Sequence, residues 1–343
     1  MKKLLNTLYI TSEDIYLGLE NENVVAFRGE EKVGQYPLIL FQSIVSFSYR
    51  GASSSLMGAC CQRGIDLSFM TPNGRLTAKA YGEERGNILL RKEQYRISDD
   101  PRRSCIMARH FEFGKIYNQR WVLERTLRDH EMRVDASAIR TVSQQLQSVL
   151  ASVLEADSLD TLRGMEGQAS ARYFSVFHEL ILNQKEHFHF DGRNRRPPED
   201  NVNALLSLLY VILTNDCASA LEGVGLDAYA GFMHRDRPGR RSLALDLVEE
   251  LRAPMVDRLV ITLINTREIQ PRHFMKQPGG AVLLNEDGRR VVFAAWQAKK
   301  KEEITHPYLK EKVAWGLIPH IQAMLLARLI RGDLDGYPPF LWK

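Results

Sequence analysis

The chain has 343 residues, of which 44% are hydrophobic and 26% charged, with a formal net charge of +4. This length is enough for two domains of ordinary size, each with its own core, and the mildly basic charge permits a nucleic-acid partner without requiring one. The four cysteines lack the spacing of a zinc site, and no run suits a signal peptide or a membrane span. We therefore expect a reduced, cytoplasmic protein.

Short runs of strand-forming residues dominate the first hundred residues. Polar turns separate them, and Asn73-Gly74 between two of these runs is a strong hairpin signal. Residues 53–63 are the one predicted helix among them. Strands at this spacing favour a small sandwich or a twisted sheet. Because Pro101 disfavours continued regular structure, we place the end of this β-rich domain at residue 100, and assign it to dimerisation or to a platform role.

From residue 101 to residue 343 the sequence predicts a larger, helical domain. Residues 102–130 and 137–155 carry apolar side chains at helical spacing, and a last long helix is expected at 314–331. Within residues 279–296 the segments AVLL, NEDG and VVFAAW predict a small inserted β-hairpin. The Gly- and Pro-rich tail is expected to be an irregular arm that docks on a partner or folds back on the helical core. The predicted fold class is α+β.

Glu166 is an unusual carboxylate in this helical region. On a helix that starts near residue 165 it lies at the end of an apolar stripe formed by Ala169, Tyr173, Phe177 and Leu180. A carboxylate in such a place must pair with a cation, bind a metal or take up a proton. Alternatively, Glu166 merely complements the positive end of its helix, and the residues alone leave both interpretations open.

The segment 231–252, GFMHRDRPGRRSLALDLVEELR, holds the densest set of candidate ligands. His234 lies in a loop before a helix for which Ser242 is the expected N-cap. Three carboxylates follow at spacings that bring them close together on that helix: Asp246, Glu249 and Glu250. Imidazole and carboxylates suit Mg²⁺ or Mn²⁺, while guanidinium groups suit phosphate. The alternative interpretation is an ordinary amphipathic helix with a solvated acidic face.

Two loops carry the candidate phosphate contacts. One spans 191–203, where arginines precede a stiff Pro197-Pro198, and the other follows His234. Rigid basic loops of this kind suit contacts to a DNA backbone, although most arginine-rich loops are simply solvated. The candidates are Arg193, Arg195, Arg196, Arg235, Arg240 and Arg241.

Three long segments in a fixed order carry a family resemblance: GMEGQASARYF at 164–174, GRNRRPPEDNVNALLS at 192–207 and LDAYAGFMHRDRPGRRSLALDLVEELR at 226–252. With them the chain resembles, over nearly its whole length, the CRISPR-associated endonuclease-integrase of spacer acquisition, the first-numbered Cas protein. Its N-terminal part is similar to members from type I systems. Ser170 stands where this family usually has alanine, and we expect it to touch no metal ligand.

The resemblance implies a β-rich N-terminal domain, a helical catalytic domain and a homodimer. Two such dimers are expected to flank a dimer of a small ferredoxin-fold partner, the second-numbered Cas protein, and to act on double-stranded DNA. The family's metal ligands match Glu166, His234 and Glu249, with Asp246 beside them. A divalent ion there would assist the attack of a DNA 3′-hydroxyl on a phosphodiester. Because no carboxylate is evidently placed to polarise it, His234 is predicted to be a neutral metal ligand rather than a general base.

Two other functions share parts of this pattern. A stand-alone metal-dependent DNA nuclease of mobile-element origin would carry the same motifs without the small partner. A catalytically idle DNA-binding scaffold is disfavoured by the intact Glu166, His234 and Glu249. We therefore predict a CRISPR adaptation integrase that inserts captured double-stranded DNA into the repeat array.

Overall fold

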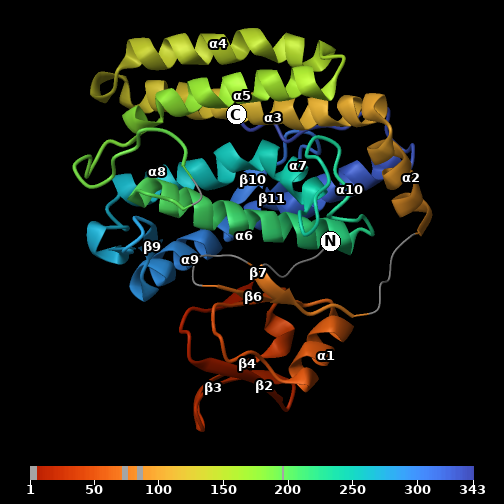
Figure 1. Ribbon diagram of the computed structural model, residues 1–343, viewed down its shortest axis with the longest axis vertical. Coiled ribbons are helices and arrows are strands. Elements are labelled where there is room, and N and C mark those ends of the chain that lie inside the picture. Colours follow the sequence, from red (N-terminus) through yellow and green to blue (C-terminus); the bar gives the residue numbers. More distant parts are fainter. Residues whose placement is uncertain (1–5, 72–75, 83–87, 195–196) are drawn as a thin grey trace. The chain divides into compact units, whose positions relative to one another are not determined.

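The structure, a computed structural model, describes residues 6–71, 76–82, 88–194 and 197–343. The chain divides into two compact units. The first comprises residues 1–85, 272–275 and 283–302, and the second comprises 86–271, 276–282 and 303–343. Figure 1 shows β-strands gathered in the N-terminal part of the chain and helices dominating the rest. This mixed architecture confirms the predicted α+β fold class.

Two sheets form the first unit. An antiparallel sheet contains β2 (Ile15–Glu20), β3 (Asn23–Arg28) and β4 (Glu31–Pro37). A mixed sheet has the order β1-β5-β6-β7, with bounds Thr7–Ile10, Ser43–Ser46, Asp66–Met70 and Leu76–Lys79. The predicted turn at Asn73-Gly74 lies outside the described residues. Apolar side chains of both sheets and of helix α1 (Ser54–Arg63) share one core, which includes the fully buried Leu17, Leu38, Ile44, Leu56 and Leu67.

The predicted hairpin at residues 279–296 is wrong in its second half. Strand β9 (Val282–Leu284) pairs with the preceding β8 (Phe274–Lys276), and the residues that follow form helix α9 (Glu286–Lys301). The segment NEDG is a helix start rather than a turn, because the Asn285 side chain accepts the N–H of Gly288 at 2.9 Å. The two acidic residues after Asn285 then favour the helix N-terminus.

Helix α9 also changes the division of the chain. Phe293 of α9 stacks on Tyr9, with ring centroids 4.4 Å apart, so this helix belongs to the first unit. Helix α2 (Ile88–Asp99) belongs to the second unit. The observed units therefore differ from a division at residue 100, because strand-rich and helix-rich stretches of sequence do not reveal where a helix packs.

The second unit is an assembly of helices. Helix α3 (Pro101–His130) begins at Asp100, whose carboxylate accepts the N–H groups of Arg102 and Arg103. Helices α3, α4 (Ala136–Glu155) and α5 (Leu159–Ser175) pack side by side (Figure 1). The remaining helices are α6 (Asn201–Gly223), α7 (Ser242–Leu251), α8 (Arg258–Asn265) and α10 (Ile318–Ile330). Strands β10 (Glu303–Thr305) and β11 (Lys312–Ala314) form an antiparallel pair.

Helix α6 is the one described helix that is long and apolar enough to cross a membrane by length and composition. Within the fold, 61% of that stretch is buried. Leu205, Leu209 and Leu213 are fully covered, so the apolar sequence of α6 supplies the centre of the helical unit.

The tail after α10 folds back on the helical core, which is one of the two arrangements that its composition predicts. The side chain of Asn118 on α3 donates to the Phe340 carbonyl at 2.7 Å and accepts the Trp342 N–H at 2.8 Å. Phe340 and Trp342 are buried, and the Arg258 guanidinium lies 4.2 Å from the centroid of the Trp342 ring. The tail is therefore an ordered part of the second unit.

Candidate active site

Asp246 on α7 organises the loop that carries His234. The fully buried carboxylate accepts the backbone N–H groups of Phe232, Met233 and His234 at 2.6, 3.0 and 3.0 Å. One of its oxygens also lies 2.6 Å from the Nδ1 atom of His234. Because a carboxylate accepts, this contact assigns the ring proton to Nδ1 and leaves the Nε2 lone pair available to a ligand.

The expectation that no carboxylate orients His234 is therefore wrong. Twelve residues separate Asp246 from His234, and a loop return of that length cannot be read from spacing. Gly231 makes the return possible, because a Cβ there would meet the Ser242 Cβ at 2.6 Å. The predicted N-cap is also off by one residue. Arg241 holds that position, and the Ser242 hydroxyl donates to the Arg235 carbonyl at 3.3 Å.

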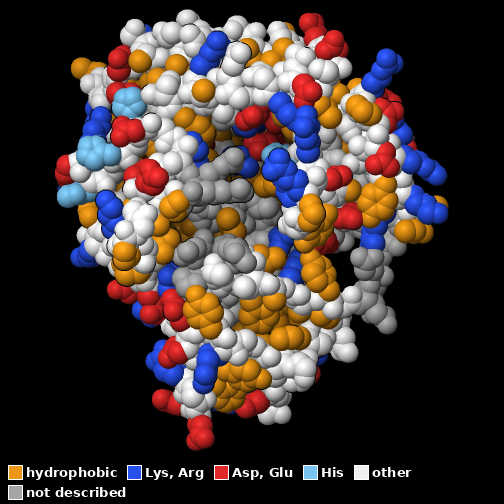
Figure 2. Space-filling view, viewed as in Figure 1, with side chains coloured by type: hydrophobic (Ala, Val, Ile, Leu, Met, Phe, Trp, Pro, Cys, Tyr) orange, Lys and Arg blue, Asp and Glu red, His pale blue; other side chains and the backbone are white. Residues whose placement is uncertain are grey.

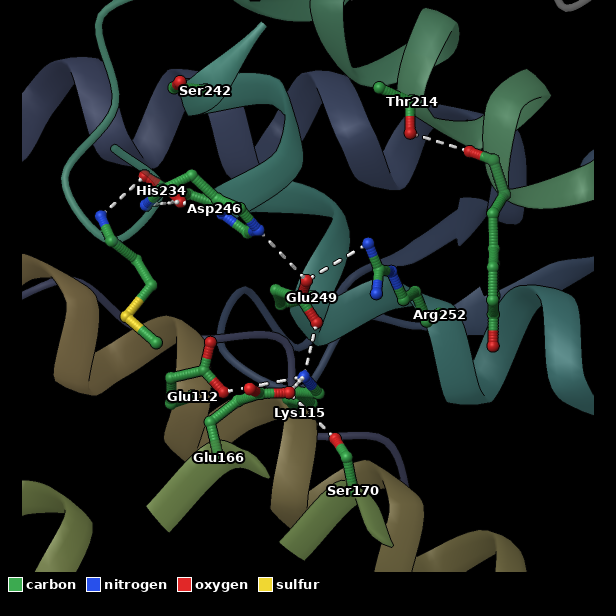
Figure 3. A network of polar contacts seen from close by, with 12 residues as sticks. Glu112, Lys115, Glu166, Ser170, Thr214, His234, Ser242, Asp246, Glu249 and Arg252 are labelled. Carbon is green, nitrogen blue, oxygen red and sulfur yellow. Dashed lines mark hydrogen bonds and ion pairs between the residues drawn. The ribbon is translucent and has the colours of Figure 1, made fainter. Parts of the chain in front are cut away.

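Glu249 lies one turn after Asp246 and connects His234 to the rest of the cluster (Figure 3). Its Oε1 atom is 3.8 Å from His234 Nε2 and 3.1 Å from an Arg252 guanidinium nitrogen, and its Oε2 atom is 2.8 Å from Lys115 Nζ. Burial alone would raise the pKa of Glu249, but the positive charges of Arg252 and Lys115 hold that pKa well below its ordinary value. Glu249 is thus an ionised carboxylate inside the protein.

Glu166 reaches the same cluster from α5. Its carboxylate accepts a hydrogen bond from the Lys115 ammonium, and the Ser170 hydroxyl donates to the same oxygen at 2.9 Å. The side chain is 28% exposed, whereas Ala169 and Tyr173 on its stripe are buried. The expectation that Ser170 touches no candidate ligand is wrong, because one helical turn brings its hydroxyl onto Glu166.

Sequence reasoning missed Glu112 and Lys115, which lie one turn apart on α3. Their side chains are only 1% and 6% exposed, and Lys115 Nζ is 3.8 Å from Glu112 Oε2. Burial raises the pKa of Glu112 against the opposing charge of Lys115. Gly114 lets α3 approach α7 at this level, since a Cβ there would meet the Glu250 Cβ at 2.9 Å.

A signal for these two residues was present in the sequence. Glu112, Lys115 and Gln119 recur at helical spacing within a helix that also buries Phe111 and Ile116. Such a polar stripe on an otherwise apolar helix marks either a solvated face or a buried network. The structure shows the second, because all three side chains are buried.

Glu250 does not belong to this cluster. It faces the tail, where its carboxylate accepts from the Tyr337 hydroxyl, from Gln322 Nε2 at 3.1 Å and from the Phe340 N–H at 2.6 Å. Burial raises the pKa of Glu250 to about 7, against the opposing effect of these hydrogen bonds. All three acids of α7 are buried, so the alternative of a solvated acidic face is also wrong.

Arg193 lines a cavity beside the cluster. Its guanidinium donates to Asn203 Oδ1 at 2.5 Å and to Ser207 Oγ at 3.0 Å, and lies 5.3 Å from the centroid of the Tyr210 ring. The cavity has a volume of about 1320 Å³ and is also lined by Lys115, Glu166 and Arg252. It therefore opens onto Glu166, one of the candidate ligands, and onto Lys115 and Arg252, which contact Glu249.

The other predicted arginines have different surroundings. Arg195 and Arg196 lie outside the described residues. Arg235 is 68% exposed and pairs with Asp160 at 3.2 Å, Arg240 donates to the Arg235 carbonyl at 3.5 Å, and Arg241 donates to Asn215 at 2.5 Å. Figure 2 shows Lys and Arg side chains interspersed with Asp and Glu on the face in view, so basic charge is distributed rather than gathered into one block there.

The donors of this cluster suit a divalent cation in chemistry but not in their present arrangement. As they stand, no three His, Cys, Asp or Glu side chains of the described ranges could hold a metal ion. The reason is visible in Figure 3, where the Lys115 ammonium lies between Glu166 and Glu249. The donor set nevertheless fits Mg²⁺ or Mn²⁺: one imidazole nitrogen of fixed tautomer and two carboxylates from different helices.

Comparisons with known proteins identify the family. CRISPR-associated endonuclease Cas1 2 from Rhodospirillum rubrum is 47% identical over the full length of both chains. A casposase bound to integration product has a TM-score of 0.82 at 21% identity, covering 96% of this chain and 92% of that one. A Cas6-RT-Cas1–Cas2 complex has a TM-score of 0.81 at 21% identity, covering 100% of this chain and 36% of that one.

At 21% identity these two solved structures support the fold alone. The family model described as CRISPR associated protein Cas1 matches residues 8–298. This chain therefore belongs to the Cas1 family, and the resemblance carried by its three motif segments is confirmed.

Proposed function

We propose that this chain is a CRISPR adaptation integrase, a divalent-metal-dependent DNA endonuclease that joins captured double-stranded DNA to the repeat array. The observation that carries the proposal is the single network of Glu166, His234 and Glu249 in a chain whose full-length relative is named an endonuclease. The fold shared with a casposase bound to integration product supports strand transfer by a DNA 3′-hydroxyl.

In this proposal Glu166, His234 and Glu249 hold Mg²⁺ or Mn²⁺. Such a cation, when bound, supplies Lewis-acid stabilisation of the scissile phosphate and lowers the pKa of the attacking oxygen. Asp246 does not ligate. It holds the His234 ring so that Nε2 faces Glu249, and its three backbone hydrogen bonds fix the loop. Arg252 keeps Glu249 ionised from the opposite side.

The cavity beside the cluster is proposed to receive a DNA strand. Arg193 lies on its wall, and the exposed Arg235 and its neighbours Arg240 and Arg241 are proposed to contact the DNA backbone, as are Arg195 and Arg196. Replacing Arg235 and Arg240 with Ala should make the plot of log affinity against log salt shallower by about two units, one per lost phosphate contact. An unchanged slope in a filter-binding titration would remove this loop from the DNA interface.

A homodimer and a small ferredoxin-fold partner complete the proposal. The N-terminal unit leaves large apolar side chains exposed for a protein contact: Tyr16, Val33, Tyr36, Ile39 and Leu40. A chain of the same fold occurs in a Cas6-RT-Cas1–Cas2 complex, which supports a Cas2 partner, and we propose that this partner bridges two dimers.

The test is strand transfer by a Glu166→Ala variant. We expect loss of insertion of a double-stranded oligonucleotide into a repeat-bearing plasmid, with DNA affinity retained, because the arginines stay in place while a proposed metal ligand is lost. The matched control is Glu186→Ala, an acid that also lines the cavity but whose side chain is 71% exposed. Full strand transfer by Glu166→Ala in excess Mn²⁺ would contradict the assignment of Glu166 as a metal ligand.

A further inference from the structure

The Lys115 ammonium occupies the place between two of the proposed metal ligands. It donates to Glu166 on α5 and lies 2.8 Å from Glu249 on α7, while its own side chain is only 6% exposed (Figure 3). Two carboxylates from different helices are thus held together by one internal cation. A divalent ion that binds both of them must displace this ammonium, because the two positive charges would otherwise share one small buried site.

The buried carboxylate of Glu112 lies next to this ammonium. Its side chain is 1% exposed, both of its carboxylate oxygens lack a hydrogen-bond partner, and Lys115 Nζ is 3.8 Å away, beyond hydrogen-bond distance. Leaving a buried carboxylate without a donor costs free energy, so the position of Glu112 calls for a partner that arrives in another state of the site.

We propose that Lys115 is an exchangeable internal cation and that Glu112 is its second partner. In the absence of metal the ammonium holds Glu166 and Glu249 together. When a divalent cation takes these two carboxylates, the ammonium moves to Glu112 and forms a close ion pair there. The inference rests on the proposed metal site and goes beyond it, because it assigns a role to two α3 residues that are not themselves ligands.

The geometry makes this exchange a short movement. Glu112 and Lys115 are three residues apart on one helix, a spacing at which side chains meet without any change in the backbone. Closing 3.8 Å to an ordinary ion-pair distance requires a shift of about 1 Å. The exchange also balances charge: Glu112 neutralises the displaced ammonium, and the incoming cation replaces it beside Glu166 and Glu249.

A permanently fixed Lys115 explains less of the site. It would account for the contacts to Glu166 and Glu249, but it would leave Glu112 buried without a hydrogen bond in every state of the protein. The two accounts predict opposite effects of the Lys115 ammonium on the affinity for a metal ion. A fixed ammonium helps to assemble the site for metal, whereas an exchangeable one competes with metal for the same carboxylates.

The experiment measures Mn²⁺ binding to the full-length protein by titration calorimetry, without DNA. Lys115→Met should bind Mn²⁺ about tenfold more tightly, and Glu112→Gln about tenfold more weakly, which is the usual scale for residues behind metal ligands. Because Glu112 acts through Lys115, Glu112→Gln should have no effect in the Lys115→Met background. Glu166→Ala serves as the site control, and its failure to weaken Mn²⁺ binding would overturn the proposed metal site itself.

Two results overturn the exchange while leaving that site standing. One is Mn²⁺ binding that is unchanged or weaker in Lys115→Met. The other is an equal loss from Glu112→Gln in both backgrounds, which would mean that Glu112 acts on the metal directly by its charge. Should Lys115→Met fail to fold, a crystal structure of the unaltered protein with Mn²⁺ decides. Hydrogen-bond distance between Lys115 Nζ and Glu112 supports the exchange, and an ammonium still between Glu166 and Glu249 refutes it.

Discussion

Glu249 and Glu250 are consecutive residues of α7, and both are buried, yet the protein holds them in opposite ways. Glu249 meets full positive charges, those of Arg252 and Lys115, and its pKa is held well below the ordinary value. Among the described residues Glu250 meets neutral donors, and burial raises its pKa to about 7. Burial by itself therefore does not mark a functional carboxylate. The charge of its partners does.

The difference has a chemical meaning. A carboxylate kept ionised by side-chain cations can exchange them for another cation, whereas one held by a hydroxyl, an amide and a backbone N–H keeps its position. Glu249 thus belongs to the proposed metal site, whereas Tyr337, Gln322 and Phe340, here called the clasp, fix α7 through Glu250.

The largest expected effect is on DNA strand transfer, which should depend on Glu249 and not on Glu250. Glu249→Gln should lower DNA strand transfer about 10³-fold or more, because it removes a proposed metal ligand worth several kcal/mol at the transition state. Glu250→Gln should leave the rate close to that of the unaltered protein, since Glu250 faces the tail. Single-turnover assays on one labelled substrate, beside thermal melts, compare them. Equal losses of strand transfer in two equally folded variants would show that Glu249 and Glu250 do not differ in function.

The next effect is on the pH dependence of stability. Because the folded-state pKa of Glu250 is raised from 4.5 to about 7, the folded protein holds this proton more tightly than the unfolded chain does. Its contribution is fully present below pH 4.5 and is lost as the pH rises through about 7. The loss is on the order of 3 kcal/mol. Urea unfolding at several pH values should therefore show a decline in the unaltered protein that Glu250→Gln flattens.

The smallest effect concerns the clasp alone. Tyr337→Phe removes the hydroxyl that donates to Glu250 and should lower the free energy of unfolding by about 1–3 kcal/mol, the cost of leaving a buried acceptor without a donor. Tyr308→Phe is the matched control, because Tyr308 is 48% exposed and a surface change should stay within about 0.5 kcal/mol. A Tyr337→Phe variant as stable as this control would show that the tail does not hold α7.

Local patterns predicted much of the fold. The strands before residue 80 other than β4, the helix at 53–63 and the long helix near 102–130 follow from hydrophobic periodicity and helix caps. Strand β4 was missed because its residues are mostly exposed and carry no apolar periodicity. The error at 285–296 arose where one short signal serves two structures, because NEDG suits both a turn and a helix start. The Asn285 cap and the packing of Phe293 on Tyr9 both favour the helix, and a contact between such distant segments cannot be read from either segment alone.

In the candidate site, too, the sequence indicates individual residues but not the contacts between them. Glu166, His234, Asp246 and Glu249 stand in two of the three long motif segments, so the sequence could name them as candidates. The orientation of His234 by Asp246 could not, since it depends on a close approach at Gly231. Lys115 was missed because an acid and a lysine three residues apart resemble an ordinary surface pair until the partner helices are known.

The hydrogen bonds to Glu250 also make the position of α7 depend on residues near the end of the given sequence. Its donors Tyr337 and Phe340 follow Glu250 by 87 and 90 residues, so a chain that stops before them carries every proposed ligand but not the groups that satisfy this carboxylate. We expect such an interrupted chain to hold α7 poorly against α3, which keeps Glu249 from its place beside Lys115. An interrupted chain should therefore lack the assembled cluster of Glu249 and Lys115, even though it contains both residues.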